Sequence, residues 1–342
     1  MAFDVFETLG KLPHFKILGD RHRRQLADVA MVPFEVGPGE KLLVEGEEDD
    51  SMMLLVSGSL EVQQGDPPVV LAEIAEGELV GDMAMYSGEG RRCASVVTKE
   101  SCQIILIERH GLYALREMIN PAVALLESAA LRSLGQRVRN TDRRIAKLAK
   151  GAPIGFEEDE GFFSKLMSLL GPPKATLAAP PQPDPVAALI ASPAFAGLDQ
   201  NGMLALAQRL IPVLVHENEV ITHEAAVEDC AYIIGTGRVN VYRAKRRRMH
   251  VHVAELHPGA FFGLVSLVHG RIRSATCVAA EPCWLFKLTG EDYEHLEKAE
   301  TPEALVLRQA VFRALCQELT AANLHLTQLL QLKSQVKALS QE

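Results

Sequence analysis

An acid and an arginine lie ten positions apart in the stretch GDMAMYSGEGRRCASV, which covers residues 81–96 and contains Asp82 and Arg92. A glycine before an acid at the start of a short helix exposes backbone N–H groups, and such groups bind anions. A nearby arginine can add two parallel, charge-assisted hydrogen bonds to a phosphate. The carboxylate would repel a phosphate, so it should face a neutral donor such as a ribose hydroxyl. The small residues after Arg92 let a ligand approach the backbone, and together these features favour a site for a phosphate joined to a sugar.

A second copy of this pattern lies in residues 261–278, which read FFGLVSLVHGRIRSATCV. Gly263, Arg273 and Ser274 keep the pattern, whereas Leu264 stands where the first copy has its acid. A leucine cannot accept a hydrogen bond from a sugar hydroxyl, so the affinity of this second site for the same ligand should fall. We therefore predict a degenerate or altered second pocket, in which Arg273 could still serve a different anion such as a cyclic dinucleotide.

Both copies belong to an internal repeat, in which Pro13 and Phe15 correspond to Pro193 and Phe195. Each copy has a helical stretch, then short apolar segments cut by glycines and acidic turns, then a long helix. Short, evenly spaced strands indicate a sandwich or barrel rather than a parallel sheet. The predicted fold class is mainly β with α: two β-rolls of the jelly-roll (double-stranded β-helix) type, each followed by a long helix.

The two long helices, predicted at about 121–149 and 302–339, carry apolar residues spaced alternately by three and four. This spacing is typical of coiled coils, and the stripes are longer than one small barrel should cover. We therefore expect a homodimer joined through these helices. The alternative is that each helix packs on its own domain.

The chain divides into three predicted segments. Residues 1–150 form a first domain with its long helix, and residues 190–342 form a divergent second domain with a coiled-coil helix. Residues 151–189 are an acidic, proline-rich linker, which favours an extended conformation. Within the linker, residues 162–170 (FFSKLMSLL) predict a short amphipathic helix, which docks either on its own domain or on a partner or membrane surface.

The first pattern resembles the phosphate-binding cassette of the cyclic nucleotide-binding domain family. That cassette reads roughly F-G-E-L-A-L, then a short turn and R-x-A-[TS]-V, and residues 80–85 and 92–96 match its two parts. The resemblance covers residues 10–150 and 190–335. The first long helix is similar to the dimerisation helix of the catabolite activator (Crp/Fnr) family, which begins with Asn-Pro.

The resemblance implies a role for each cassette residue of the first domain. Gly81 and Met83 would lend backbone groups, and Asp82 would take the ribose hydroxyl. Arg92 would take the cyclic phosphate, and Thr141, on the long helix, would reach the base.

The first cassette also departs from the family pattern. Asp82 replaces a glutamate and is one methylene shorter, and Cys93 stands where a Ser or Thr often hydrogen-bonds the phosphate. A thiol is a weak donor. The alternative for this site is a structural ion pair in which Asp82 and Arg92 bridge each other. The candidate ligand residues of the second domain are Gly263, Leu264, Arg273 and Ser274.

Charge and composition exclude several classes of protein. The chain has 342 residues and a net charge of −9, so no global basic field indicates nucleic acid. The local basic run at residues 243–248 is interpreted as a hairpin turn, and we expect no helix-turn-helix domain after either long helix. Neither a signal peptide nor a membrane span is predicted, and the six scattered cysteines favour a reducing cytoplasm. His250 and His252 alternate along one strand, but no third ligand follows at a suitable spacing, so no metal site is predicted.

These observations predict a non-enzymatic, cytoplasmic, bacterial sensor or adaptor. No Walker loop, nucleophile elbow or kinase signature occurs in the sequence. We expect the first domain to bind cAMP or a related cyclic nucleotide, with no further cofactor, and the chain to signal to an unidentified partner protein rather than to DNA. The alternatives are a cyclic-di-GMP receptor, a ligand-free dimeric scaffold with vestigial pockets, and a DNA-binding regulator.

Overall fold

The computed structural model of the chain describes residues 3–13, 15–87, 90–150, 180–245 and 249–339. The contacts divide the chain into two compact units. The first unit is Met1–Ile145 together with Cys316–Glu342, and the second is Ala146–Leu315. The last part of the C-terminal helix therefore lies in the first unit, whereas the sequence-based division assigned it to the second domain.

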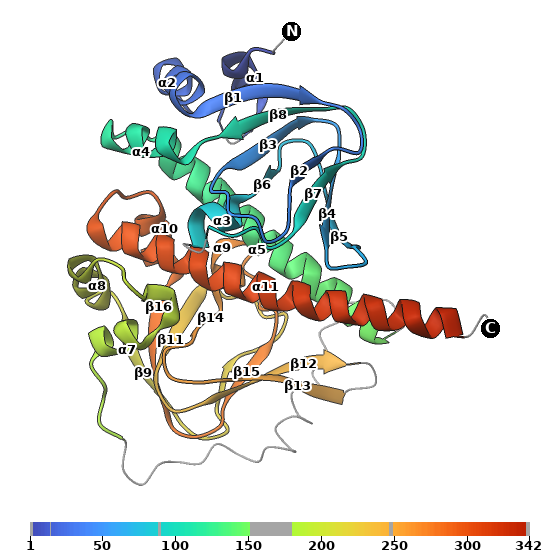
Figure 1. Cartoon of the computed structure of the whole chain (residues 1–342). Helices are drawn as coiled ribbons and strands as arrows, with labels where there is room; N and C mark the ends of the chain where they lie inside the picture. The colour runs from blue at the N-terminus through green and yellow to red at the C-terminus, as the bar shows by residue number, and fades with distance from the viewer. Residues whose placement is uncertain (1–2, 14, 88–89, 151–179, 246–248, 340–342) are drawn as a thin grey trace. The chain divides into compact units, whose positions relative to one another are not determined.

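In the first unit, two helices precede a roll of short strands, and two further helices follow it (Figure 1). The elements are α1 (Val5–Lys11), α2 (Asp20–Ala30), β1 (Met31–Val36), β2 (Lys41–Leu43), β3 (Met52–Ser57), β4 (Leu60–Gln64), β5 (Val69–Ile74), β6 (Leu79–Val80), α3 (Asp82–Ser87), β7 (Ser95–Thr98), β8 (Cys102–Ile107), α4 (Arg109–Glu117) and α5 (Ala122–Lys150). The strands form two four-stranded sheets, in the orders β1-β8-β3-β6 and β2-β7-β4-β5, and every pairing is antiparallel.

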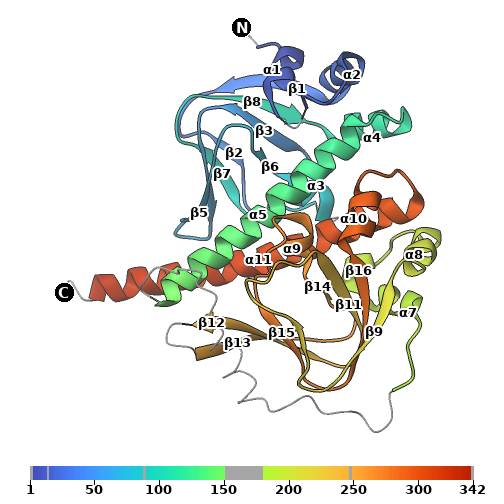
Figure 2. The same ribbon diagram turned by 180° about the vertical axis from the view of Figure 1, so that it is seen from behind.

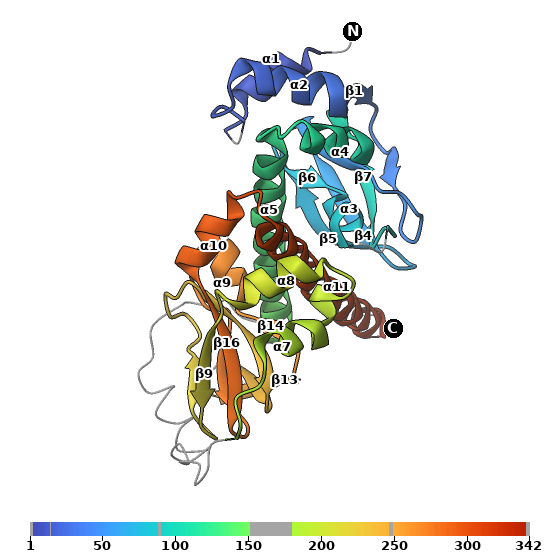
Figure 3. The same cartoon turned by 90° about the vertical axis from the view of Figure 1, so that its left-hand side faces the viewer.

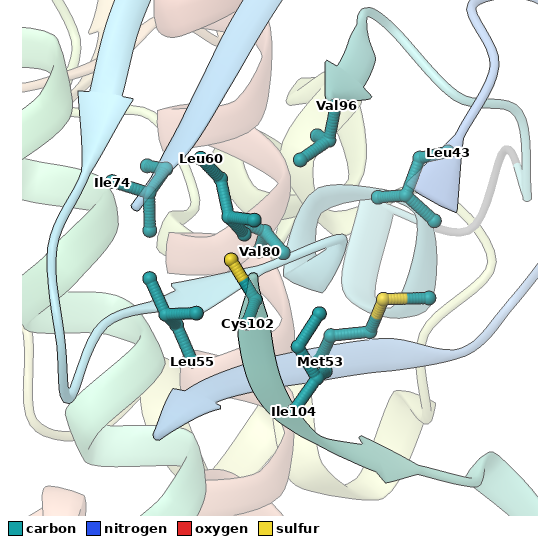
Figure 4. Close-up of a cluster of buried hydrophobic side chains, with 9 residues drawn as sticks. All are labelled: Leu43, Met53, Leu55, Leu60, Ile74, Val80, Val96, Cys102 and Ile104. Carbon is teal, nitrogen blue, oxygen red and sulfur yellow. The ribbon is translucent and has the colours of Figure 1, made fainter. Parts of the chain in front are cut away.

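The core of the first roll lies between its two sheets. One sheet contributes Leu55 and Ile104, and the other contributes Leu43, Leu60 and Val96. Figure 4 shows these side chains gathered with Met53, Ile74, Val80 and Cys102. Two sheets that face each other in this way bury the side chains of their inner faces, and the short apolar segments of the sequence lie in these strands.

The second unit repeats the same order of elements (Figures 2 and 3). The elements are α7 (Pro185–Ala191), η1 (Pro193–Phe195), α8 (Gln200–Ala207), β9 (Ile211–Val215), β10 (Val220–Thr222), β11 (Cys230–Thr236), β12 (Val239–Lys245), β13 (Met249–Leu256), β14 (Phe261–Phe262), α9 (Leu264–Val268), β15 (Thr276–Ala279), β16 (Cys283–Thr289), α10 (Gly290–Glu297) and α11 (Pro302–Leu339), of which the part up to Leu315 belongs to this unit. Its sheets have the orders β14-β11-β16-β9 and β10-β15-β12-β13, which match those of the first unit strand for strand. The predicted fold class of two β-rolls with helices is confirmed.

Both long helices are present where the sequence predicted them. The first begins after Asn120, whose side-chain Oδ1 accepts a hydrogen bond from the backbone N–H of Ala122 at 2.9 Å. Seam residues on this helix are buried in the single chain: Leu131, Leu134 and Val138 are each 0% exposed. A second copy of the chain is therefore not needed to cover these positions.

Most of the segment predicted as a linker, residues 151–179, lies outside the described residues. Residues 162–170 lie outside the described residues, so the short amphipathic helix predicted there stays a prediction. Helix α7 begins at Pro185, inside the segment predicted as linker, because Asp184 caps it by accepting a hydrogen bond from the N–H of Val186. Before this helix, the backbone oxygen of Pro180 accepts a hydrogen bond from Nε1 of Trp284 at 2.8 Å.

The first half of the basic run, residues 243–245, ends β12, which pairs with β13 as an antiparallel hairpin. Residues 246–248 themselves lie outside the described part of the chain. Among the described residues, no three His, Cys, Asp or Glu side chains gather as a metal site would require. Within the same residues, no helix combines the length and the apolar character needed to cross a membrane.

Candidate functional site

Gly81 joins strand β6 to the short helix α3 and sets the geometry of the first cassette. Its φ of 82° lies in the left-handed region that favours glycine. A Cβ at this position would lie 2.7 Å from Nη1 of Arg92 and 3.0 Å from the backbone oxygen of Ser51. The glycine is therefore needed both for the turn and for the close approach of the arginine.

Arg92 is buried and is held on its Nη side by the chain itself. Nη1 donates a hydrogen bond to the backbone oxygen of Gly81 at 2.9 Å, and Nη2 donates to the backbone oxygen of Ser51 at 2.7 Å. Nη2 also lies 2.5 Å from a carboxylate oxygen of Asp49. Nε of Arg92 is buried without a hydrogen-bond partner among the described residues. One donor of this guanidinium thus has no partner among the described residues.

Asp82 is the first residue of α3 and is 1% exposed. One carboxylate oxygen, Oδ2, forms an ion pair with Arg137 of α5. Burial alone would lower the pKa of Arg137, but the charge of Asp82 and its hydrogen bond raise this pKa above its ordinary value. The other oxygen, Oδ1, is buried without a partner in the described part of the structure. Asp82 therefore keeps one free acceptor.

The structure brings Asp82 and Arg92 into one cassette but does not pair them with each other. The acid is paired with Arg137, and the arginine is paired with Asp49. The alternative of a self-contained bridge between Asp82 and Arg92 is therefore not what the described contacts show. Each of the two side chains instead retains one buried polar atom without a partner.

Cys93 and Met83 contact each other through their sulfur atoms, at 3.6 Å. Burial raises the pKa of the Cys93 thiol, although the charge of Arg137 acts in the opposite direction. The backbone oxygen of Cys93 accepts a hydrogen bond from Nε2 of Gln64 at 2.9 Å. Cys93 is therefore a neutral thiol that packs beside α3, and its backbone is tied to the end of β4.

Thr141 lies on α5, one turn beyond Arg137. Its hydroxyl donates a hydrogen bond to Oδ1 of Asn323 at 3.2 Å, and Asn323 lies in the part of α11 that belongs to the first unit. One turn further along α11, Thr327 donates to Oε1 of Gln64 at 3.1 Å. Helix α11 thereby joins the same polar network as the cassette.

The second cassette differs from the first in how many nitrogen atoms of its arginine have partners. Arg273 is buried; Nε lies 3.0 Å from Glu228, Nη1 donates to Oγ of Ser266 at 2.8 Å, and Nη2 lies 2.9 Å from Sγ of Cys230. Nη1 also donates to the backbone oxygen of Gly263 at 3.3 Å.

All three nitrogen atoms of Arg273 thus have partners among the described residues. Leu264 begins α9 and is buried, and Ser274 is half-buried beside the arginine. Among the described side chains of this second cassette, no buried polar atom lacks a partner.

Sequence reasoning missed several residues of the first site. The missed residues are Asp49, Ser51, Gln64, Arg137 and Asn323. A signal existed for Asp49, because an acid stands at the equivalent place, Glu228, in the second repeat. No local signal marks Asn323, because its contact with Thr141 spans 182 residues of sequence.

Comparison with known proteins shows the family to which the two rolls belong. Residues 33–118 and 212–300 match the family model of the cyclic nucleotide-binding domain, and these two segments make up half of the chain. The chain belongs to the cyclic nucleotide-binding domain family and carries two such domains in tandem.

Two curated relatives show which kinds of protein carry similar domains. A cAMP-dependent protein kinase regulatory subunit from Dictyostelium discoideum is 24% identical over 264 residues, which cover 75% of this chain and 62% of that protein. A cyclic nucleotide-gated potassium channel from Rhizobium etli is 31% identical over 119 residues, which cover 35% of this chain and 32% of that protein. The chain thus matches less than two thirds of the length of either relative.

The solved structures that resemble the chain include two regulatory domains of protein kinase A. The regulatory domain from Toxoplasma gondii, crystallised with cAMP, covers 90% of this chain and 95% of that chain, with 15% identity and a TM-score of 0.32. The regulatory subunit of a cAMP-independent protein kinase A from Trypanosoma cruzi, bound to guanosine, aligns with 85% of this chain over 82% of its own length. The two are 17% identical, with a TM-score of 0.31.

Proposed function

We propose that this chain is a cyclic-nucleotide sensor whose first domain binds cAMP and whose second domain is a divergent, non-binding copy. The observation that carries the proposal is a pair of buried polar atoms in the first cassette, Oδ1 of Asp82 and Nε of Arg92, which have no partners among the described residues. One is an acceptor on an acid, and the other is a donor on a cation.

A cyclic nucleotide offers the two groups that these atoms lack. A buried polar atom without a hydrogen bond costs about 1–3 kcal/mol, more when the group is charged. The cyclic phosphate would accept from Nε of Arg92, and the neighbouring ribose hydroxyl would donate to Oδ1 of Asp82. Both groups belong to the same ring system of the ligand, so one molecule satisfies both atoms.

The same reasoning supports a silent second domain. Arg273 already has partners at each nitrogen, and Leu264 offers no acceptor for a sugar hydroxyl. A phosphate would have to displace Glu228 from the arginine, and nothing nearby would hold the ribose. We therefore assign nucleotide binding to the first domain alone.

Output from the site would pass through α5. Asp82 is shared between Arg137 on this helix and the proposed ribose hydroxyl, so occupancy changes the environment of the ion pair. A ligand shifts a conformational equilibrium only as far as it binds one arrangement better than the other. The names of the two curated relatives, a kinase regulatory subunit and a gated channel, support a regulatory module. Signalling to a partner protein rather than to DNA is part of the proposal. We propose a cytoplasmic location on the sequence arguments given above.

A ligand-free scaffold with vestigial pockets is the second candidate, because Arg92 is already held on its Nη side by Gly81, Ser51 and Asp49. Isothermal titration of the full chain with cAMP, cGMP and cyclic di-GMP separates the candidates. The sensor predicts heat with cAMP. No heat with any of the three ligands at about millimolar concentration would favour the scaffold, and heat with cyclic di-GMP alone would favour the cyclic-di-GMP receptor.

A further inference from the structure

The turn between α1 and α2 of the first unit presents an apolar side chain outward. Phe15 and Leu18 are buried and anchor the turn. Between these two anchors, Lys16 is exposed and Ile17 is 74% exposed. The backbone N–H groups of Phe15 and Lys16 both donate to the backbone oxygen of Leu12, so the turn is tight. Ile17 is therefore held on the outer side of the turn by its buried neighbours.

Four exposed basic side chains surround this isoleucine in the sequence: Lys11, Lys16, Arg21 and Arg24. They lie at the end of α1, in the turn and on the outward face of α2, and Figures 1 and 3 show these two helices side by side at one edge of the first unit. Residues 11–24 contain a single acid, Asp20, and Arg23 already pairs with it at 2.6 Å. Residues 11–24, called the basic turn below, therefore carry a local excess of positive charge.

The second repeat contains the same turn without this chemistry. Phe195 anchors it and is buried, as Phe15 is in the first repeat. Ala196 and Gly197 stand in the places of the exposed lysine and isoleucine, and residues 191–204 contain no Lys or Arg. The fold of the turn thus needs the buried anchor but neither the basic side chains nor the exposed isoleucine. These side chains instead equip one surface of the first unit for a contact.

An anionic lipid bilayer matches this combination of side chains. Each Lys or Arg near a negatively charged membrane surface strengthens binding by about fivefold. An exposed aliphatic side chain among such residues can enter the boundary between the headgroups and the acyl chains. A nucleic acid would neutralise the positive charges but would leave Ile17 in water, so the isoleucine favours a lipid surface.

The acidic character of the whole chain does not oppose this contact at short range. The chain has a net charge of −9, but salt screens exposed charges from each other beyond about 8 Å at physiological ionic strength. A bilayer that touches the basic turn therefore responds to the charge of this turn, which is positive, rather than to the net charge of the chain.

We propose that the basic turn docks the chain on the surface of an anionic membrane. Ile17 inserts between the lipid headgroups, and the four exposed basic side chains contact the negatively charged groups around it. A single inserted side chain with a few basic residues gives peripheral, reversible binding. The proposal is independent of nucleotide binding, because no residue of the basic turn belongs to either cassette.

Flotation of the full chain with lipid vesicles tests the proposal. One set of vesicles is pure phosphatidylcholine, and the other contains about one third phosphatidylserine. The wild-type chain should float with the phosphatidylserine vesicles at about millimolar lipid and should stay behind with the neutral ones. Raising the salt from about 0.05 M to 0.5 M should release it, because salt screens the contact.

Two variants of the turn and one matched control locate the contact. Lys16→Glu combined with Arg21→Glu should weaken binding at least about 25-fold. Ile17→Gly, which installs the residue of the second repeat, should weaken binding about tenfold, because an aliphatic side chain no longer leaves water. Lys41→Glu combined with Lys333→Glu makes the same change of net charge at exposed positions elsewhere and should keep the wild-type affinity.

The wild-type chain alone can overturn the proposal, so the test does not depend on the folding of a variant. Equal flotation with both sets of vesicles, or none with either, contradicts docking on an anionic membrane. Equal weakening in the control would show that net charge, and not the basic turn, sets the binding. Unchanged affinity in Ile17→Gly, or retention of the chain by a DNA duplex but not by vesicles, would also overturn the assignment to a lipid surface.

Discussion

Arg92 and Arg273 occupy equivalent places, but the acid beside each arginine contacts a different nitrogen atom. Each is held by an acid from the same position of its repeat, Asp49 or Glu228. In the second repeat the acid takes Nε of the arginine, whereas in the first it takes Nη2 and leaves Nε without a described partner. An aspartate is one methylene shorter than a glutamate. The choice of acid thus accounts for why one guanidinium keeps a donor for a phosphate and the other does not.

The acid beside Arg92 predicts a pH dependence of stability. Burial tends to raise the pKa of Asp49, but hydrogen bonds from Arg92 and Ser51 hold this pKa below its ordinary value of 3.8. A carboxyl group whose pKa is depressed on folding stabilises the protein above its unfolded-state pKa, and this stabilisation is lost as the pH falls through the folded-state pKa. We therefore expect Asp49→Asn to lower the free energy of unfolding above about pH 5, and the difference from wild type to vanish at lower pH.

Urea unfolding of both chains between about pH 3 and pH 7 measures this difference. Glu47→Gln removes a charge from an exposed side chain nearby and serves as the control. A gap between Asp49→Asn and wild type that stays constant over the whole range would show that the charge of Asp49 does not act on Arg92.

At the scale of the element, the turn into α3 leaves room for Arg92 because Gly81 has no side chain. Gly81 and Gly39 have almost the same φ, 82° and 81°. A Cβ at Gly81 would lie 2.7 Å from Nη1 of Arg92, whereas a Cβ at Gly39 would have no neighbour within 4 Å. The two glycines therefore separate the cost of backbone strain from the cost of displacing the arginine.

We expect Gly39→Ala to lower the free energy of unfolding by about 1–2 kcal/mol, which is the cost of an L-residue in the left-handed region. Gly81→Ala should cost more and should also weaken cAMP binding at least about tenfold, because Arg92 must move away from its position. Urea unfolding and isothermal titration of both variants measure the two effects. Equal losses of stability with unchanged binding in both variants would show that the arginine tolerates the extra carbon.

The elements themselves were predictable because their signals are local. Glycines, acidic turns and apolar runs define the strands, and the apolar seams define both long helices. Helix α7 was missed although its signal was present, an aspartate cap followed by Pro185. The pairing of Asp82 with Arg137 could not be predicted, because it spans 55 residues and depends on how α5 packs against the roll. The cassette residues were therefore predictable, and their partners were not.

At the scale of the whole chain, the apolar stripes of the two long helices are buried within a single chain. The sequence predicts a homodimer from the apolar stripes, and this remains a prediction. In the structure, however, Leu131 and Leu134 of α5 and Leu319 and Leu326 of α11 are buried within one chain. Because these positions need no second copy to cover them, any dimer would have to use another surface or an exchange of helices.

The central claim also concerns the whole chain: the first domain binds cAMP and the second does not. Equilibrium dialysis with labelled cAMP tests it in the wild-type chain and in the matched variants Arg92→Lys and Arg273→Lys. A lysine keeps the charge but loses the forked donors of a guanidinium. The account predicts about one cAMP per wild-type chain, an unchanged value in Arg273→Lys, and affinity at least about tenfold weaker in Arg92→Lys, since a hydrogen bond to a charged group contributes about 1.5–3 kcal/mol. Two bound molecules per chain, or full affinity in Arg92→Lys, would contradict it.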